Sequence, residues 1–375
     1  MINLKYIVNV TGPIFDRIDG GNLIGEGRWE RNVLDALVRD GREVYVVPWK
    51  NGGTYTPGQV RVWQSPEPKP KNLKDFCELE DITNTVFISH SPHGYLDIPV
   101  KAHRYILHWF NGPDAPADKE FRDFSNQNSG SVVATYSFLT RTNHYLARID
   151  RQNLVHMHGP TVPKIYFDKN NFREEYLLWS SKLLYSWAED NRMQKFLIKL
   201  FTWCCSVMLE DSVLKLVLLF GSAGRYTTQE EVINWFWNNP VSQPLQKMKE
   251  RIVFLNRIPW YQVQETLSKT RLVITPHILY GGPPYEAAAF GIPIIMSKQN
   301  NPFQSSTHIS LFSEVLAVDD SYHNNDFFIF LDRLYRDESF YISTGSAYRN
   351  FVSENASYKA YLVDLDKLCK DRGWT

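Results

Sequence analysis

Residues 280–286 combine residue types that could bind a diphosphate. Their sequence, Tyr-Gly-Gly-Pro-Pro-Tyr-Glu, lies between a short apolar run and a stretch of helix-forming residues. Glycine lets a backbone approach a ligand closely, and the start of a helix carries a partial positive charge. Because proline has no N–H group, the candidate donors to an anion are the amides of Tyr280, Gly281 and Gly282, with Tyr285 as a further candidate.

Glu286 adds a carboxylate directly after this turn. A carboxylate can accept two hydrogen bonds, such as those that a ribose diol donates. A second interpretation needs no ligand, because the same pattern fits a tight turn whose glutamate caps the following helix. The local pattern alone does not separate the two interpretations.

The elements around this turn predict one half of a doubly wound α/β sheet. Residues 272–274 and 292–296 are short apolar runs of the kind found in buried strands, and helix-forming residues at 285–290 separate them. Gly291 lies where the helix should end in a left-handed conformation. Strand, turn, helix and strand in this order form the repeating unit of a parallel sheet.

The same alternation extends over most of the 375 residues, a length that predicts two domains. In the first half we expect a helix at 29–39 and strands at 4–10, 43–47, 85–89, 104–107, 132–135 and 153–157. In the second half we expect strands at 176–180, 214–220, 252–255, 272–274, 292–296 and 315–318. The helices expected there are 193–208, 230–237, 260–269, 285–290, 327–335 and 358–370.

Histidines follow two predicted strands of the first half. His90 and His93 come after the strand at 85–89, and His108 comes after the strand at 104–107. The carboxyl ends of parallel strands are where α/β sheets bind ligands. The alternative for each histidine is a structural or merely exposed residue. The loop after the first strand is rich in glycine but lacks the Gly-x-Gly-x-x-Gly spacing of dinucleotide-binding proteins.

Taken together, these features resemble the GT-B glycosyltransferases, in particular the retaining glycosyltransferase family four. The donor-binding motif of that family matches at Gly281, Glu286, Ala287, Gly291 and Pro293. The resemblance implies a GT-B fold, in which two Rossmann-like, doubly wound α/β domains face a central cleft. It places an acceptor-side domain at 1–168 and a nucleotide-sugar-binding domain at 169–355, and it implies that a final helix at 356–375 packs back on the first domain.

On the donor side, the resemblance assigns the diphosphate to Lys182 and to Arg192, with Lys195 as a second candidate for the latter position. Gly221 corresponds to the family's glycine loop near the nucleotide, and Asn256 and Arg257 correspond to its base-binding loop. Tyr280, Gly281, Gly282 and Glu286 complete this predicted donor site.

On the acceptor side, the resemblance implies that Gly25, Gly27 and Arg28 face the cleft. The alternative for Arg28 is a solvated surface. His108 matches the family's histidine that reaches the donor sugar, and Glu26 and His93 are further catalytic candidates.

The implied activity is transfer of a sugar from a nucleotide-diphosphate sugar, with UDP or GDP as the expected nucleotide, to a hydroxyl of an oligosaccharide, glycoprotein or glycolipid. The family needs neither a metal nor another cofactor. A retaining reaction is implied, but Ile278 stands where the family has its first glutamate. An inverting reaction would need a base such as Glu26, His90 or His93. A binding protein without catalysis is the alternative from another class, and a sugar-nucleotide epimerase ranks lower because no convincing carboxylate pair is present.

Composition sets further limits. The 41 basic and 41 acidic residues leave a formal net charge of +0, which argues against a nucleic-acid-binding protein. The four cysteines include no Cys-x-x-Cys pair, so we expect neither a zinc site nor a redox pair, and a reducing, cytoplasmic location. We expect no signal peptide and no transmembrane segment, while peripheral contact with a membrane stays open.

Overall fold

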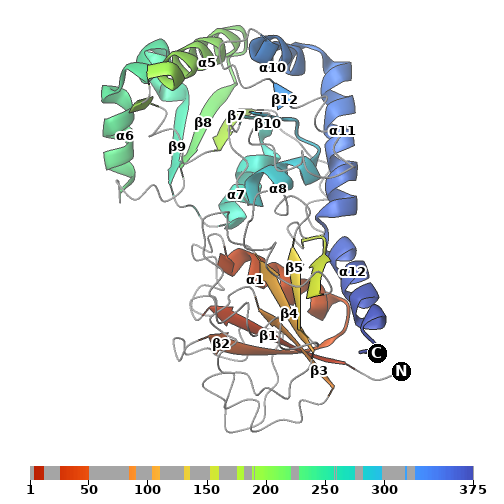
Figure 1. The fold of residues 1–375 in the computed structure, drawn as a ribbon. Helices are drawn as coiled ribbons and strands as arrows, with labels where there is room; N and C mark the ends of the chain where they lie inside the picture. The colour runs from red at the N-terminus through yellow and green to blue at the C-terminus, as the bar shows by residue number, and fades with distance from the viewer. Residues whose placement is uncertain are drawn as a thin grey trace. The chain divides into compact units, whose positions relative to one another are not determined.

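The computed structural model describes residues 4–11, 26–49, 84–89, 104–109, 131–135, 153–159, 175–180, 188–189, 191–220, 228–256, 258, 260–274, 282–297, 317–318 and 326–374. The chain divides into two compact units (Figure 1). Unit 1 comprises Met1–Lys164 and Ser353–Thr375, and unit 2 comprises Ile165–Val352. The sequence predicts these limits at 168 and 355.

Unit 1 contains a parallel sheet of six strands in the order β2-β1-β3-β4-β5-β6. The strands are β1 (Lys5–Thr11), β2 (Glu43–Trp49), β3 (Thr85–Ser89), β4 (Tyr105–Trp109), β5 (Ser131–Thr135) and β6 (Leu154–His156). The chain adds β2 on one side of β1 and β3 to β6 on the other. The direction of winding therefore reverses between β1 and β3.

Two helices far apart in the sequence pack together in unit 1, namely α1 (Glu26–Arg39) and α12 (Tyr358–Asp371). Apolar residues of α1, including Val33 and Leu37, are fully buried. The hydroxyl of Tyr358 donates a hydrogen bond to Oδ1 of Asn32 on α1, over 3.1 Å in a buried setting. The C-terminal helix is thus part of the core of unit 1.

Unit 2 contains a second parallel sheet of six strands, in the order β12-β11-β10-β7-β8-β9. Its strands are β7 (Tyr176–Ser180), β8 (Lys215–Phe220), β9 (Ile252–Asn256), β10 (Thr270–Ile274), β11 (Ile294–Ser297) and β12 (Ala317–Val318). This is the strand order of dinucleotide-binding Rossmann sheets. The winding reverses between β7 and β10.

The helices of unit 2 are α5 (Asn191–Glu210), α6 (Gln229–Asn238), the 3₁₀ segment η6 (Pro240–Arg251), α7 (Trp260–Ser268), α8 (Gly282–Phe290), α10 (Asp326–Arg336) and α11 (Glu338–Asn355). Right-handed crossovers put α5 and α6 on one face of the sheet and α7 and α8 on the other. Figure 1 shows α7 beside α8, and the two helices are in contact.

Both faces of the second sheet are buried, as expected for a parallel sheet. Alternate strand residues, for example Leu177 and Trp179, belong to one apolar cluster with α5, α6 and α10. Trp179 meets Phe201 of α5 edge to face, with ring centroids 6.3 Å apart. The intervening residues, such as Leu178, are equally buried on the face of α7 and α8. The predicted α/β class therefore holds in both units.

The end of α8 forms as predicted. Gly291 has φ +78°, and this left-handed conformation is accessible to glycine without a steric penalty. The amide of Gly291 donates to the carbonyl of Ala288, and the amide of Ile292 donates to that of Ala287, both over 2.9 Å. These two bonds define a Schellman motif, which fixes the direction of the chain between α8 and β11.

Among the described residues, no helix is both long enough and apolar enough to span a membrane. Cys204 and Cys205 lie within α5, where Cys204 is fully buried in the apolar cluster and Cys205 packs against it. Both cysteines therefore contribute to the packing of α5.

Helix α6 begins with a capping box that offers a direct test of local stability. The side chain of Thr228 accepts a hydrogen bond from the amide of Glu231, and the carboxylate of Glu231 accepts one from the amide of Thr228. Replacing Thr228 with alanine should lower the free energy of unfolding by about 1 kcal/mol. Thr202→Ala is the matched control, because Thr202 lies inside α5 and its hydroxyl donates a hydrogen bond to the carbonyl of Ile198 in the preceding turn. Equal urea-unfolding midpoints for the two variants would contradict this assignment.

Candidate functional site

The reversal of winding in unit 2 locates the candidate site. In open α/β sheets, ligands bind outside the carboxyl ends of the two strands at which the winding reverses. These strands are β7, which ends at Ser180, and β10, which ends at Ile274. They are direct neighbours, with Trp179 in register with Ile274.

A helix follows each of these two strands and begins near this edge of the sheet. Helix α5 follows β7, and α8 follows β10. The starts of both helices contribute backbone N–H groups and partial positive charge at the same edge. Arg192 is the second residue of α5, so the topology brings this predicted diphosphate ligand to the edge. Lys182, which follows β7, lies outside the described residues.

The predicted anion-binding turn precedes α8. Tyr280 and Gly281 lie outside the described residues, whereas Gly282 is the first residue of the helix. The strong helix-forming residues begin at Tyr285 in the sequence, but the helix itself begins earlier, at Gly282. Proline is well tolerated in the first helical turn, where its missing N–H group has no helical partner, so Pro283 and Pro284 belong to α8.

We expected Glu286 on the first turn of the helix. It is instead the fifth residue of α8 and therefore lies beyond that turn. A capping-box glutamate lies at the third helical position, so this position argues against the capping interpretation. The residue is 0% exposed, and its neighbours Tyr285 and Ala287 are also buried. Burial raises the pKa of the Tyr285 hydroxyl. A buried carboxylate is costly unless hydrogen bonds satisfy it, so Glu286 holds a position with a specific polar requirement.

The other predicted donor residues lie in the sequence at or after the carboxyl ends of β8 and β9. Asn256 is the last residue of β9, while Gly221, after β8, and Arg257, after β9, lie outside the described residues. Three strand spacings of about 4.8 Å separate β10 from β9, a span of about 14 Å along the edge. The topology thus places the predicted donor residues that the structure describes in one row from α8 across β7 and β8 to β9, namely Gly282, Glu286, Arg192 and Asn256.

In unit 1 the winding reverses between β1 and β3, and the predicted acceptor residues that the structure describes belong to α1, which follows β1, and to β4. Glu26, Gly27 and Arg28 form the start of α1, which follows β1. We predicted a helix from residue 29, so the placement of Gly27 and Arg28 in a loop is wrong. Gly25 and His93 lie outside the described residues.

His108 requires a second correction. It lies inside β4 rather than after it, because the strand continues to Trp109 and pairs His108 with Ala134 of β5. The residue is the last but one of the strand, next to the carboxyl end of β3 in the sheet order. Its backbone is therefore near the edge at which we expected it.

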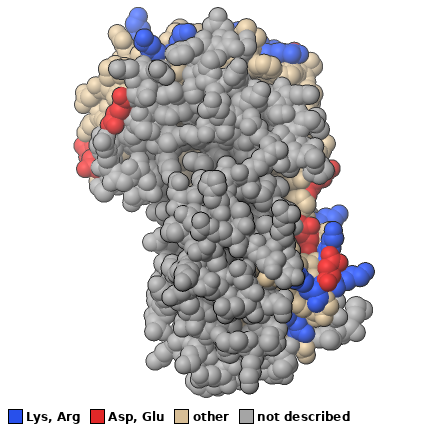
Figure 2. Space-filling model, viewed as in Figure 1, with Lys and Arg blue, Asp and Glu red and all other residues tan. Residues whose placement is uncertain are grey.

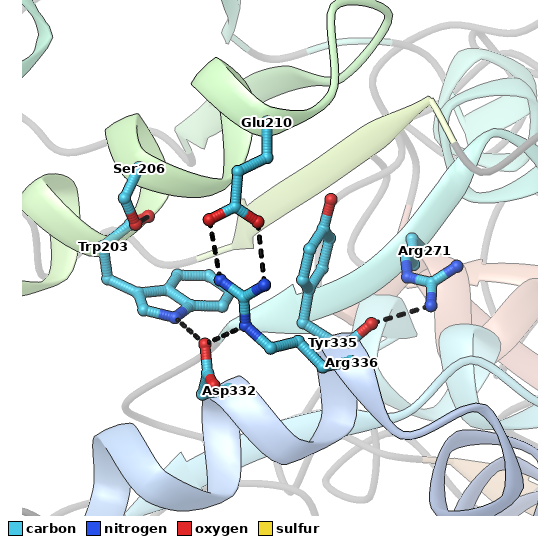
Figure 3. Close-up of polar contacts among 7 residues, drawn as sticks. All are labelled: Trp203, Ser206, Glu210, Arg271, Asp332, Tyr335 and Arg336. Carbon is cyan, nitrogen blue, oxygen red and sulfur yellow. Dashed lines mark hydrogen bonds and ion pairs between the residues drawn. The ribbon is translucent and has the colours of Figure 1, made fainter.

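A hollow of about 720 Å³ opens between α5 and α10 of unit 2. Figure 3 shows the polar side chains of these two helices that contact one another. The hollow is lined by Trp203, Phe328, Ile329, Asp332, Arg333, Arg336 and Asp337. Its polar groups bond one another. Trp203 Nε1 donates to Asp332 over 3.1 Å, and the Arg336 guanidinium donates to both carboxylate oxygens of Glu210 over 2.8 and 2.9 Å. Because crossover helices run antiparallel to the strands, Trp203 and Glu210 lie toward the amino ends of the strands.

Comparison with known proteins identifies the fold. No protein-family model matches the chain, and no curated protein matches it in sequence. Among solved structures, a glycosyltransferase from Rickettsia africae is similar over 99% of both chains, with 13% identity and a TM-score of 0.62. The Anabaena protein HepE, in complex with UDP and glucose, is similar over 99% of this chain and 100% of its own, with 11% identity and a TM-score of 0.58. The fold is GT-B.

The GT-B fold carries more than one activity. A putative UDP-N-acetylglucosamine 2-epimerase from Listeria monocytogenes is similar over 100% of this chain and 98% of its own, with 14% identity and a TM-score of 0.56. Identities of this size show a shared fold and do not single out family four or any one reaction. Activity must therefore be argued from the site.

Proposed function

We propose that this protein is a glycosyltransferase that moves a sugar from a nucleotide-diphosphate sugar to a hydroxyl group of a glycan-type acceptor. One observation carries the proposal. The point at which the winding of unit 2 reverses lies beside the start of α8, which follows the glycine-rich turn in the sequence and carries the buried Glu286. The similarity to HepE, which was crystallised with UDP and glucose, supports the same class of donor.

In this proposal the diphosphate is the leaving group. Negative charge grows on it as the glycosidic bond breaks, so N–H groups and cations already aimed at it stabilise the transition state more than the ground state. The starts of α5 and α8 supply the N–H groups, and Lys182 and Arg192 supply the cations. These groups can balance the charge without a metal ion, and the carboxylate of Glu286 would accept hydrogen bonds from the ribose hydroxyls.

The acceptor would bind to unit 1, near the start of α1 and the carboxyl end of β4, with Gly25, Gly27 and Arg28 as binding residues. His108 would reach the donor sugar. Family resemblance favours retention of configuration, with UDP or GDP as the nucleotide. Because Ile278 offers no polar group, inversion with Glu26 or His93 as base is the alternative reaction, and nucleotide-sugar binding without catalysis is the alternative function.

We also propose a reducing, cytoplasmic location, in which contact with a membrane would be peripheral. Cys204, Cys205 and Cys369 are free thiols, which is usual for proteins of such a compartment.

A thermal-shift screen with UDP-, GDP-, dTDP- and ADP-sugars, without and then with magnesium, tests the proposal. A ligand at a hundredfold excess over its Kd should stabilise the fold by about 2.7 kcal/mol. We expect one nucleotide to raise the melting temperature, with the same shift in the absence of magnesium. No shift with any ligand at millimolar concentration would contradict the proposed donor site.

Product analysis separates the remaining alternatives. Slow release of free sugar from the bound donor without acceptor is expected of a transferase, whereas an epimerised nucleotide-sugar would identify an epimerase. Binding with neither product would favour the non-catalytic alternative.

A further inference from the structure

The chain passes between the two units twice, and three polar residues of unit 1 lie beside these passages. It leaves unit 1 after β6, where His158 precedes the limit at Lys164. It returns at Ser353, near the end of α11, where Asn355 and, in α12, Asp364 follow. Connections of this kind are where domain motions find their hinges.

One carboxylate oxygen of Asp364 makes two contacts with His158. Its Oδ2 accepts a hydrogen bond from the backbone amide of His158 over 2.6 Å and lies 2.8 Å from Nδ1 of the imidazole. The side chain of Asn355 forms a further hydrogen bond with the imidazole. Carboxylate and imidazole are both half-buried, with 21% and 39% of their side-chain surfaces exposed.

A second anchor holds the same helix and does not depend on a histidine. The Arg42 guanidinium contacts both oxygens of Asp366, over 2.8 and 2.9 Å, and donates to the hydroxyl of Tyr6 over 2.8 Å. A guanidinium keeps its charge at all pH values at which the protein is folded. One turn of α12 therefore carries a titratable anchor at Asp364 and a permanent one at Asp366.

We propose that His158, Asp364 and Asn355 form a proton-dependent clasp that ties the outgoing and returning connections together within unit 1. With the imidazole protonated, the ion pair and both hydrogen bonds to Asp364 hold the first half of α12 against the end of β6. Loss of one proton removes the charge of the imidazole and with it the ion pair, and it leaves the hydrogen bonds to Asp364 from the backbone amide and from Nδ1–H of the neutral ring. The beginning of α12 then opens more readily, while its Asp366 anchor stays.

The groups that face the imidazole set the direction of the pH dependence. Asp364 on α12 supplies the charge and Asn355 on α11 supplies an amide, while Asp366, the next acidic residue along α12, is paired with Arg42. Basic and acidic side chains are interspersed around α12 (Figure 2). The hydrogen bond to Asp364 raises the pKa of His158 above its ordinary value. Stabilisation is thus complete below about pH 6.5, the pKa of a histidine in an unfolded chain, and is lost as the pH rises through the higher folded value.

Thermal unfolding of the full chain between about pH 5.5 and pH 9 tests the clasp, because histidine titrates in this interval. Asp364→Asn keeps the size of the side chain and its acceptor for the backbone amide but removes the charge. We expect it to lower the Tm by about 2–4 °C at the acidic end, and we expect this difference to shrink as the pH rises. Asp366→Asn is the matched control, and its effect should stay constant over the same interval.

Parallel curves for the two variants would overturn the proposal. Should Asp364→Asn fail to fold, proton NMR of the unmodified protein decides, since a His158 pKa at or below about 6.5 would equally overturn it. Hydrogen exchange, corrected for the intrinsic pH dependence, should show increasing opening of residues 355–362 toward alkaline pH. The corrected exchange rates of the residues near Asp366 should not change with pH.

Discussion

Replacing Gly345 with alanine is expected to lower the free energy of unfolding of unit 2 by about 2–3 kcal/mol. A Cβ atom at this position would lie 2.0 Å from the carbonyl oxygen of Gly291 and 3.0 Å from its carbonyl carbon. These are backbone atoms of the turn after α8, and the Schellman motif at Gly291 holds them in place. Helix α11 would therefore have to move away from the turn, together with buried neighbours such as Tyr348.

The expected loss is a net value. Alanine favours a helix by about 1 kcal/mol over glycine, and this gain acts against the clash. Ser346→Ala is the matched control, because Ser346 lies on the exposed side of the same helix. Urea unfolding followed by tryptophan fluorescence measures both variants, since unit 2 includes the buried Trp179. Equal or higher stability of Gly345→Ala would show that α11 does not pack on the α8 turn as closely as described.

The parallel sheets could be predicted from the sequence because their strands are short apolar runs between turn residues. The strands Thr85–Ser89 and Tyr176–Ser180 have the bounds that we predicted. Both are buried among neighbouring strands, so local apolar pattern and tertiary requirement coincide. The prediction failed where pairing with a neighbouring strand, and not the apolar pattern, determines where a strand ends. His108 continues β4 because β5 offers it a partner in register.

Helix α11 could not be predicted in this way. It is rich in serine, β-branched and aromatic residues and contains Gly345, all of them weak helix formers. Its buried residues follow helical spacing but include only one aliphatic side chain, that of Val352. The close contact of Gly345 with the α8 turn leaves no signal in the local sequence. The 3₁₀ segment η6, which contains Pro240 and Pro244, was missed for a related reason, because prolines favour loops in a sequence pattern.

The candidate site was predictable in part. The glycine turn and Glu286 indicated the strand–helix junction of the candidate site, but only the strand order shows that β10 adjoins β7. Sequence spacing could not show that Arg192 lies in the first turn of the helix after the neighbouring strand, about 90 residues earlier in the chain. The pairing of parallel strands that are far apart in the sequence thus shows which candidate residues lie at the same edge of the sheet, and residue types alone do not.

Replacing Glu286 with glutamine is expected to weaken the binding of the matching nucleoside diphosphate about 10- to 100-fold. Glutamine keeps the volume of the side chain and removes its charge. A hydrogen bond to a charged group contributes about 1.5–3 kcal/mol, and an amide oxygen replaces it only in part. Isothermal titration calorimetry with the nucleotide selected by the thermal-shift screen measures the change.

Glu265→Gln is the matched control for this substitution. Glu265 lies on the neighbouring helix α7, is exposed and pairs with Lys269 on the same surface, so its replacement should leave the affinity unchanged. The melting temperature of each variant without ligand separates binding from folding. If Glu286→Gln lowers the melting temperature and leaves the affinity unchanged, the buried carboxylate stabilises α8 and does not contact ribose. The nucleotide site would then depend on the starts of α5 and α8 alone, and the assignment of Glu286 to the donor would be wrong.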